Sequence, residues 1–266
     1  MPVNPNKKPV VLIVHGVQTG TDKDQNQDRQ VKQLINNRLG GLPLTFSTDL
    51  YRYEDINDKA IAPAKQLMKL IGKTAVGKIL LSTTVDLVGD VVLNLQNGST
   101  AQLIRDGLRQ RILKYYNAGN PCYLMAHSLG SIYAFDVLNE LIAEEAYFDR
   151  NNRGSWPVQG FLTIGSPIGL AMFRKGRTKI NNLGEGNRLF RWFNYWDRSD
   201  PVVSGDIFGK NLTGFDIAKK YQANNPNQGW FIRDVAVDTG FHWLLSHTAY
   251  WSDAKVGDGL VDLISR

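Results

Sequence analysis

Short, fully apolar segments recur along the chain and alternate with segments that have helical periodicity. The clearest is Val10–Val14, five consecutive β-branched or leucine residues, which His15 and Gly16 follow directly. A strand that is apolar at every position, and not only at alternate positions, is typical of a parallel sheet that helices cover on both faces. The alternation therefore predicts an α/β fold with a mostly parallel central sheet. Further strands are predicted over residues 42–53, 122–126, 158–164, 189–196 and 231–237.

Helices are predicted where apolar residues recur every three or four positions. One of them begins at Ser99 or Thr100, either of which can cap a helix, and ends before Gly119. No linker-like segment divides the chain, so residues 1–266 are expected to form a single domain. The other predicted helices cover residues 28–39, 129–145 and 256–264.

Residues 60–95 are rich in leucine and valine and fall where a short connection would complete the fold. They are therefore predicted to be a helical insertion. Lys78, Asp86 and Asp90 interrupt any span long enough for a membrane helix. Extra helices that pack on the body of the domain are the favoured interpretation, and a cap over the functional site is the alternative.

The composition excludes several classes of protein. The 266 residues are 42% hydrophobic and 21% charged, which is ordinary for a globular protein and excludes a collagen-like or broadly disordered chain. Cys122 is the only cysteine, which excludes an intramolecular disulfide framework and a cysteine-based zinc site. No spacing of His, Asp or Glu suggests a metal site, so neither a metal nor a cofactor is expected. Residues 1–9 contain three prolines and no apolar core, so no secretory signal is predicted and a cytoplasmic location is expected.

The net charge of +6 comes with one dense basic cluster, formed by Arg174, Lys175, Arg177 and Lys179. Nucleic-acid binding surfaces usually interleave aromatic residues with such charges, and this cluster has none, so no nucleic-acid partner is expected. A solvated loop is the favoured interpretation of the cluster. A weak, salt-sensitive contact with an anionic interface is the alternative.

The residues Ala126, His127, Ser128, Leu129 and Gly130 lie between a predicted strand and a predicted helix. A serine hydroxyl that attacks a carbonyl has to stand clear of the backbone. A strained strand-to-helix turn achieves this when the residues two before and two after the serine are small, as Ala126 and Gly130 are. The helix N-terminus would also favour developing negative charge. A serine that caps a buried helix is the alternative interpretation, and the pentapeptide alone does not separate the two.

Beyond this pentapeptide, the chain resembles the α/β-hydrolase superfamily over its full length, and the serine esterases and lipases most closely. In that family an oxyanion-hole His-Gly follows an early strand, and the nucleophile follows a central strand. An acid and a histidine follow the last strands, in the chain order Ser, Asp, His. The chain departs from the common pattern at Ala126, where glycine is more frequent, as some lipases also do. The residues that match the pattern are His15, Gly16, Ser128, Asp200 and His247.

The serine nucleophile needs a histidine that accepts its proton, and the chain has four. His15 lies in the predicted oxyanion turn and His127 adjoins the serine, so neither is expected to reach the hydroxyl correctly. His242 lies in the apolar run 241–245, where a buried structural histidine is the favoured interpretation. His247 resembles the family's base and is preferred, with His242 as the alternative.

The acid has two candidates after the strand predicted over residues 189–196. Asp200, with Pro201 fixing the turn, resembles the family's acid and is preferred. Asp197 lies closer to the end of the strand and is the alternative, with capping of the loop as its other interpretation. The resemblance also implies an oxyanion hole made by the backbone N–H groups of Val17 and Leu129.

The resemblance implies a serine hydrolase that cleaves carboxylic esters through a Ser-His-Asp triad and an acyl-enzyme intermediate. The expected partner is a small-molecule or lipid-like ester. If residues 60–95 cover the serine, the same apolar surface is available to an acyl chain, and turnover should rise with acyl length. A non-catalytic binding or interaction protein with the same fold is the alternative, which the presence of all three triad residue types in order disfavours.

Overall fold

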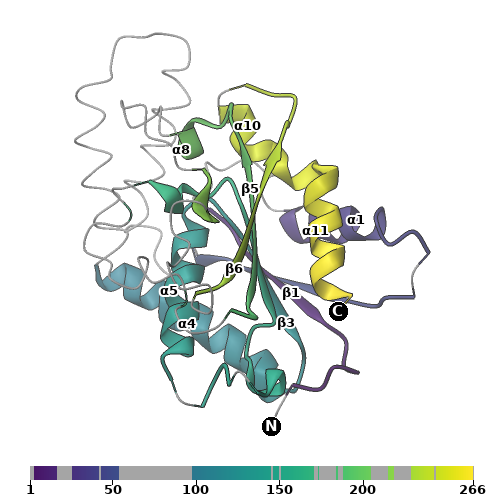
Figure 1. The fold of residues 1–266 in the computed structure, drawn as a ribbon, viewed down its shortest axis with the longest axis vertical. Helices are drawn as coiled ribbons and strands as arrows, with labels where there is room; N and C mark the ends of the chain where they lie inside the picture. Colours follow the sequence, from purple (N-terminus) through teal and green to yellow (C-terminus); the bar gives the residue numbers. More distant parts are fainter. Residues whose placement is uncertain are drawn as a thin grey trace.

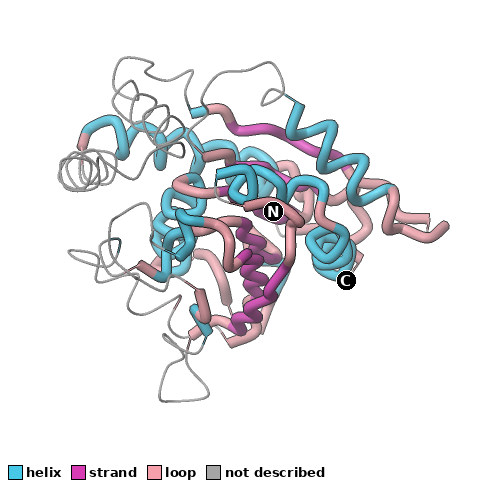
Figure 2. The backbone as a smooth tube through the Cα atoms, turned by 90° about the horizontal axis from the view of Figure 1, so that it is seen from above, coloured by secondary structure: helices cyan, strands magenta, loops and turns pink. Residues whose placement is uncertain are grey.

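In the computed structural model a single open sheet has helices on both of its faces (Figure 1). Viewed from above, the helices lie on either side of the strands (Figure 2). The predicted insertion over residues 60–95, the basic cluster at 174–179 and Val17 lie outside the described residues. The structure describes residues 3–16, 26–41, 43–53, 98–144, 146–149, 151–170, 173, 184, 188–204, 215–218, 229–242 and 244–265.

All six strands are parallel, and their order across the sheet is β2-β1-β3-β4-β5-β6. This confirms the predicted α/β class and the mostly parallel central sheet. The order reverses at β1, which pairs with β2 on one side and with β3 on the other. In open α/β sheets, functional sites form beyond the carboxyl ends of the strands near such a reversal. The strands are β1 (Val10–Val14), β2 (Ser47–Tyr51), β3 (Cys122–His127), β4 (Gly160–Ile164), β5 (Arg191–Asp197) and β6 (Phe231–Val237).

The helices form two layers, one on each face of the sheet. Residues of α4 (Ser99–Asn117) and α5 (Gly130–Ile142) share one buried apolar cluster, and those of α1 (Gln27–Asn36) and α11 (Ala254–Ile264) share the other. Two short helices, α8 (Pro201–Ser204) and α10 (Leu244–Ala249), follow β5 and β6. The short 3-10 turns among the described residues are η3 (Arg153–Ser155), η4 (Pro167–Gly169) and η6 (Tyr250–Ser252).

The fully apolar strands supply both cores, because successive side chains point to opposite faces of a sheet. In β1, Leu12 and Val14 pack in the cluster with α4 and α5, while Val11 and Ile13 pack in the cluster with α1 and α11. Each of these four side chains is buried. A polar residue at any of them would face a core, which explains why the strand is apolar throughout.

The limits of some elements differ from the predictions because neighbouring strands determine how far a ladder extends. The strand predicted over residues 42–53 is formed only at Ser47–Tyr51, where each residue pairs with one of the five residues of β1. The strand predicted over residues 231–237 has those limits in the structure. Within the described ranges, none of the helices has both the length and the apolar character needed to cross a membrane.

Candidate active site

Three side chains meet beyond the carboxyl ends of the strands. Ser128 directly follows β3, Asp200 lies between β5 and α8, and His247 belongs to α10. The Nε2 atom of His247 is 2.9 Å from Ser128 Oγ, and its Nδ1 atom is 2.8 Å from Asp200 Oδ2. The exposed fractions are 6% for Ser128, 2% for His247 and 0% for Asp200. The structure thus brings together the serine, the histidine and the aspartate that were preferred from the sequence.

The backbone at Ser128 is strained. Its φ angle of 53° lies in the left-handed region, which residues other than glycine rarely adopt. The turn also packs directly on the end of β1, where a Cβ atom on Gly130 would lie 2.2 Å from the carbonyl oxygen of His15. A Cβ atom on Gly16 would lie 2.6 Å from that of Ser128. The glycine expected two residues after the nucleophile is therefore required by close approach of the backbone.

Hydrogen bonds to its backbone hold Ser128 in this conformation. Its N–H donates to the carbonyl of Ile164 at the end of β4, at 3.2 Å. Its carbonyl accepts a hydrogen bond of 2.5 Å from the Ser131 hydroxyl, which lies 2.6 Å from the hydroxyl of Ser166. The Ser166 oxygen also accepts from the N–H of Ile168. These contacts fix the turn from α5 and from the end of β4, so Ser131 and Ser166 are supporting residues that sequence reasoning did not identify.

The hydrogen bonds determine which nitrogen of His247 carries the proton. The ionised carboxylate of Asp200 only accepts hydrogen bonds, so the Nδ1 atom of His247 must be the donor. The Nε2 atom then has a free lone pair, which accepts the hydrogen bond of the Ser128 hydroxyl. The other carboxylate oxygen of Asp200 accepts from the N–H of Val202, at 2.9 Å. The imidazole is therefore in the tautomer that a general base for a serine requires.

Asp197, the alternative acid, has a structural task. Its Oδ1 atom accepts from the N–H of Ser199, and its Oδ2 atom accepts from both the N–H and the hydroxyl of Thr239, at 2.7, 2.8 and 2.6 Å. These bonds cap the loop after β5 and tie it to the residues that follow β6. The carboxylate of Asp197 thus closes the loop that carries Asp200.

Of the remaining histidines, His242 has different surroundings from those expected. His242 is exposed, so the prediction of a buried structural histidine is wrong; the apolar run around it includes Phe241 and Leu245, which are themselves 49% and 64% exposed. His15 is buried, and its ring stacks on that of Tyr53 with the centroids 4.7 Å apart.

His127 is buried beside the base. Its Nε2–H donates to the backbone carbonyl of His247 at 2.8 Å, and its ring centroid lies 4.6 Å from that of His247. Burial, followed by the neighbouring His247, lowers the pKa of His127 well below its ordinary value. His127 is therefore neutral near pH 7 and fixes the backbone of α10.

One of the two expected oxyanion donors can be placed. Leu129 is the N-cap residue of α5, so its N–H belongs to the end of the helix where backbone N–H groups have no acceptor within the helix. It follows Ser128 directly, and the helix dipole favours negative charge at this point. The second expected donor, Val17, lies outside the described residues.

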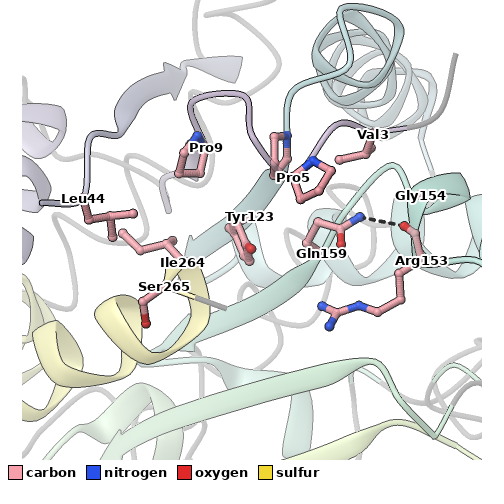
Figure 3. A pocket seen from close by; sticks show the side chains of 11 residues that line it. Val3, Pro5, Pro9, Leu44, Tyr123, Arg153, Gly154, Gln159, Ile264 and Ser265 are labelled. Atoms are coloured by element: carbon pink, nitrogen blue, oxygen red, sulfur yellow. Dashed lines mark hydrogen bonds between the residues drawn. The ribbon is translucent and has the colours of Figure 1, made fainter.

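A cavity of about 390 Å³ lies at the opposite edge of the sheet, where the strands begin (Figure 3). Pro9 precedes β1, Pro121 precedes β3 and Gln159 precedes β4, and all three line it. The cavity is thus separate from the three side chains at the carboxyl ends. Within the part of the chain that the structure describes, no group of three or more His, Cys, Asp or Glu side chains could hold a metal ion.

The parallel sheet, the strained serine between β3 and α5 and the order Ser128, Asp200, His247 define one architecture. The fold is that of the α/β hydrolases. It includes the flanking helices on both faces, as the sequence predicted. The helical insertion within it cannot be placed, because residues 54–97 are not among those described.

The similarity of this chain to known proteins is distant. The sequence matches no protein-family model and no curated protein. The similar solved structures include an uncharacterized protein from Bacillus cereus, with 9% identity and a TM-score of 0.45 over 98% of this chain. The match covers 60% of the length of that protein.

Two further similar structures match most of both chains. One, from work on the metagenome-derived lipolytic enzymes LipS and LipT, has 8% identity and a TM-score of 0.48, and the match covers 98% of this chain and 95% of the other. The other is Est1E from Butyrivibrio proteoclasticus, with 11% identity, a TM-score of 0.41 and coverage of 99% and 91%. Function is therefore inferred from the geometry of the site itself.

Proposed function

We propose that the protein is a serine hydrolase that cleaves carboxylic esters, with Ser128 as nucleophile, His247 as general base and Asp200 as the acid that orients the base. The observation that carries the proposal is the continuous hydrogen-bonded chain from Ser128 Oγ through both nitrogens of His247 to Asp200 Oδ2. A serine that merely caps a helix needs neither this chain nor a left-handed backbone.

The geometry supports a two-step acyl transfer. Ser128 Oγ attacks the ester carbonyl while its proton moves to Nε2 of His247, and Asp200 stabilises the imidazolium that forms. The oxyanion of the tetrahedral intermediate accepts a hydrogen bond from the N–H of Leu129. The intermediate collapses as His247 returns the proton to the departing alcohol, leaving an acyl-enzyme. A water molecule, deprotonated by the same nitrogen, then attacks the acyl group, and the proton passes back to Ser128 as the carboxylic acid leaves.

The preference for esters with an apolar acyl group is supported by the surface near the base. Phe241 and Leu245 are exposed on the segment that leads into and includes α10, which carries His247. Exposed apolar side chains close to a catalytic histidine offer a surface to the hydrocarbon part of a substrate, at about 0.8 kcal/mol for each buried methylene.

A fluorophosphonate probe tests the proposal directly, because it reacts only with an activated serine. We expect stoichiometric labelling of Ser128, located by mass spectrometry, and hydrolysis of p-nitrophenyl esters. Ser128→Ala should abolish labelling and lower kcat by about 10⁶ while shifting Tm by only a few degrees, because the hydroxyl contributes little packing. Ser252→Ala, which removes an exposed hydroxyl that bonds only to Ala249, is the matched control and should label as the wild type does.

Two outcomes would contradict the proposal. Labelling at another serine would remove Ser128 as nucleophile, and the absence of both labelling and turnover would favour a non-catalytic binding protein with the same fold. An ester series tests the substrate class separately. Rising kcat/KM from C2 to C8 is expected, and a flat or falling profile would contradict the preference for apolar acyl chains.

A further inference from the structure

Tyr250 shares one oxygen atom with the catalytic pair. It begins the turn η6 immediately after α10, three residues beyond His247. Residues three apart in a helical turn lie on the same face, so the imidazole and the phenol reach the same partner. The Tyr250 hydroxyl donates to Asp200 Oδ2 at 2.8 Å, and the Nδ1–H of His247 donates to that same oxygen at 2.8 Å.

The phenol is itself oriented by a second hydrogen bond. Its oxygen accepts from the backbone N–H of Asp197 at 2.8 Å, so its own proton is directed to Asp200. Burial, followed by the negative charge of Asp200, raises the pKa of Tyr250 well above its ordinary value. The hydroxyl therefore remains a donor throughout the pH range in which a histidine base works.

The phenol is enclosed by its neighbours. Tyr250 is fully buried. Gly165, at a φ of +55°, faces all three groups: a Cβ atom there would lie 2.9 Å from Tyr250 Cε2, 3.1 Å from Asp200 Oδ2 and 3.1 Å from His247 Nδ1. Asp200, His247 and Tyr250 thus pack against Gly165, directly after β4, where there is no room for a side chain. The same contact with Gly165 therefore positions the Tyr250 ring, Asp200 and His247.

We propose that Tyr250 is a positioning residue that holds the Asp200 carboxylate against His247 and limits how strongly this carboxylate stabilises the protonated imidazole. The inference rests on the proposed function of the Ser128, His247 and Asp200 triad. Two donors on Oδ2 share its negative charge. Without the phenol the carboxylate turns more freely and attracts the proton of His247 more strongly.

The direction of the effect follows from the charges around the imidazole. Removing the hydroxyl favours the imidazolium, so the pH at which His247 loses its proton rises and the acid limb of the kcat/KM profile moves to higher pH. The other titratable groups nearby are the neutral His127 beside the ring, His15, which interacts electrostatically with His127, and the Asp197 carboxylate, which Ser199 and Thr239 hold. The substitution changes none of these side chains; at Asp197 it removes only the acceptor of the backbone N–H, and the carboxylate keeps its bonds to Ser199 and Thr239.

Tyr250→Phe tests the inference, because it keeps the buried ring and removes only the hydroxyl. We expect the NMR titration of the His247 ring, with isotopically labelled histidine, and the acid limb of kcat/KM to move upward together by about half a pH unit or more. At neutral pH, kcat should fall about tenfold with little change in KM, because substrate contacts remain. Tyr51→Phe is the matched control: it removes a buried hydroxyl that donates to the Ile104 carbonyl on the far side of the sheet, and should move neither titration.

The readouts separate this inference from the proposed function. An unshifted His247 titration in a folded Tyr250→Phe variant would overturn the positioning role, whatever the activity. A shifted titration in a protein whose Ser128 is never labelled would overturn the hydrolase proposal alone. If Tyr250→Phe does not fold, 3-fluorotyrosine at position 250 replaces it. This stronger donor should move the His247 titration to lower pH, and no shift would overturn the inference.

Discussion

At the scale of single residues, Asp197 and Asp200 have different roles because their hydrogen-bond partners differ. Asp200 accepts from an imidazole, a phenol and one backbone N–H. Asp197 accepts from the backbone N–H of Ser199 and from both donors of Thr239. The first carboxylate can respond to proton transfer at the imidazole, whereas the second is confined to its loop. Both residues carry the same carboxylate, so the assignment of Asp200 as the acid depends on geometry alone.

A pair of asparagine substitutions should separate these roles. Asp200→Asn removes the acceptor that fixes the tautomer of His247, and kcat should fall by about 10⁴ with a small change in Tm. Asp197→Asn loses charged hydrogen bonds to Thr239 and should lower the free energy of unfolding by about 1.5–3 kcal/mol, with a smaller loss of activity. Ester kinetics and denaturant unfolding of both variants measure the difference. If Asp197→Asn proves inactive while stable, the acid has been misassigned.

At the scale of elements, the start of α5 lies directly against the end of β1. Gly130 faces two backbone carbonyls of that strand, with an added Cβ atom 2.2 Å from the oxygen of His15 and 2.8 Å from that of Val14. Backbone in the centre of a parallel sheet cannot move aside as a side chain does. The contact therefore transmits any displacement of α5 to the strained serine that precedes it.

Gly130→Ala should accordingly damage both stability and the elbow. We expect a loss of more than about 3 kcal/mol in the free energy of unfolding and no labelling of Ser128, because the added methyl group forces the helix from the strand. Gly257→Ala in α11 is the matched control, since the atoms nearest to its Cβ atom would belong to the side chains of Leu34 and Arg38, at 2.9–3.1 Å, and not to the backbone. The variant should retain activity and lose little stability. Thermal unfolding with probe labelling distinguishes the two, and an active Gly130→Ala enzyme would contradict this account.

At the scale of the whole molecule, the burial of a neutral histidine makes stability depend on pH. His127 has a folded pKa well below 6.5, the ordinary value that applies when the chain is unfolded. Below pH 6.5 the unfolded state therefore binds a proton that the folded state does not. By linkage, stability falls as the pH decreases through this window, until the folded pKa is reached.

His127→Gln should reduce this acid sensitivity while its amide keeps a donor for the carbonyl of His247. The slope of the unfolding free energy between pH 6.5 and 5 should decrease by up to about 1.4 kcal/mol per pH unit relative to the wild type. His242→Gln alters an exposed histidine and serves as the control, with an unchanged slope. Urea titrations at several pH values provide the comparison. Equal slopes in wild type and His127→Gln would contradict the role of His127.

Which features could be predicted from the sequence depends on how local the information is. Apolar runs such as Val10–Val14 predict strands because both faces of the sheet are buried. The small residues around Ser128 predict the turn because sterics act between adjacent residues. The surroundings of His242 could not be predicted, since an apolar run is compatible with either face of the molecule. Tyr250 was not identified because its partner Asp200 is 50 residues away in the chain. The spacing His-x-x-Tyr could have indicated that both side chains lie on one face of a turn.

The distance between the site residues along the chain also determines when, during translation, the complete site can form. Ser128 and the strands that strain its turn are translated long before His247, which lies 119 residues further along. A nascent polypeptide that has reached residue 200 therefore carries a serine with no base to activate it. On the proposed function, ester hydrolysis therefore requires that the turn bearing His247 and Tyr250 has left the ribosome and packed against Gly165. The Ser128 hydroxyl thus has its proposed base only when the rest of the sheet is complete.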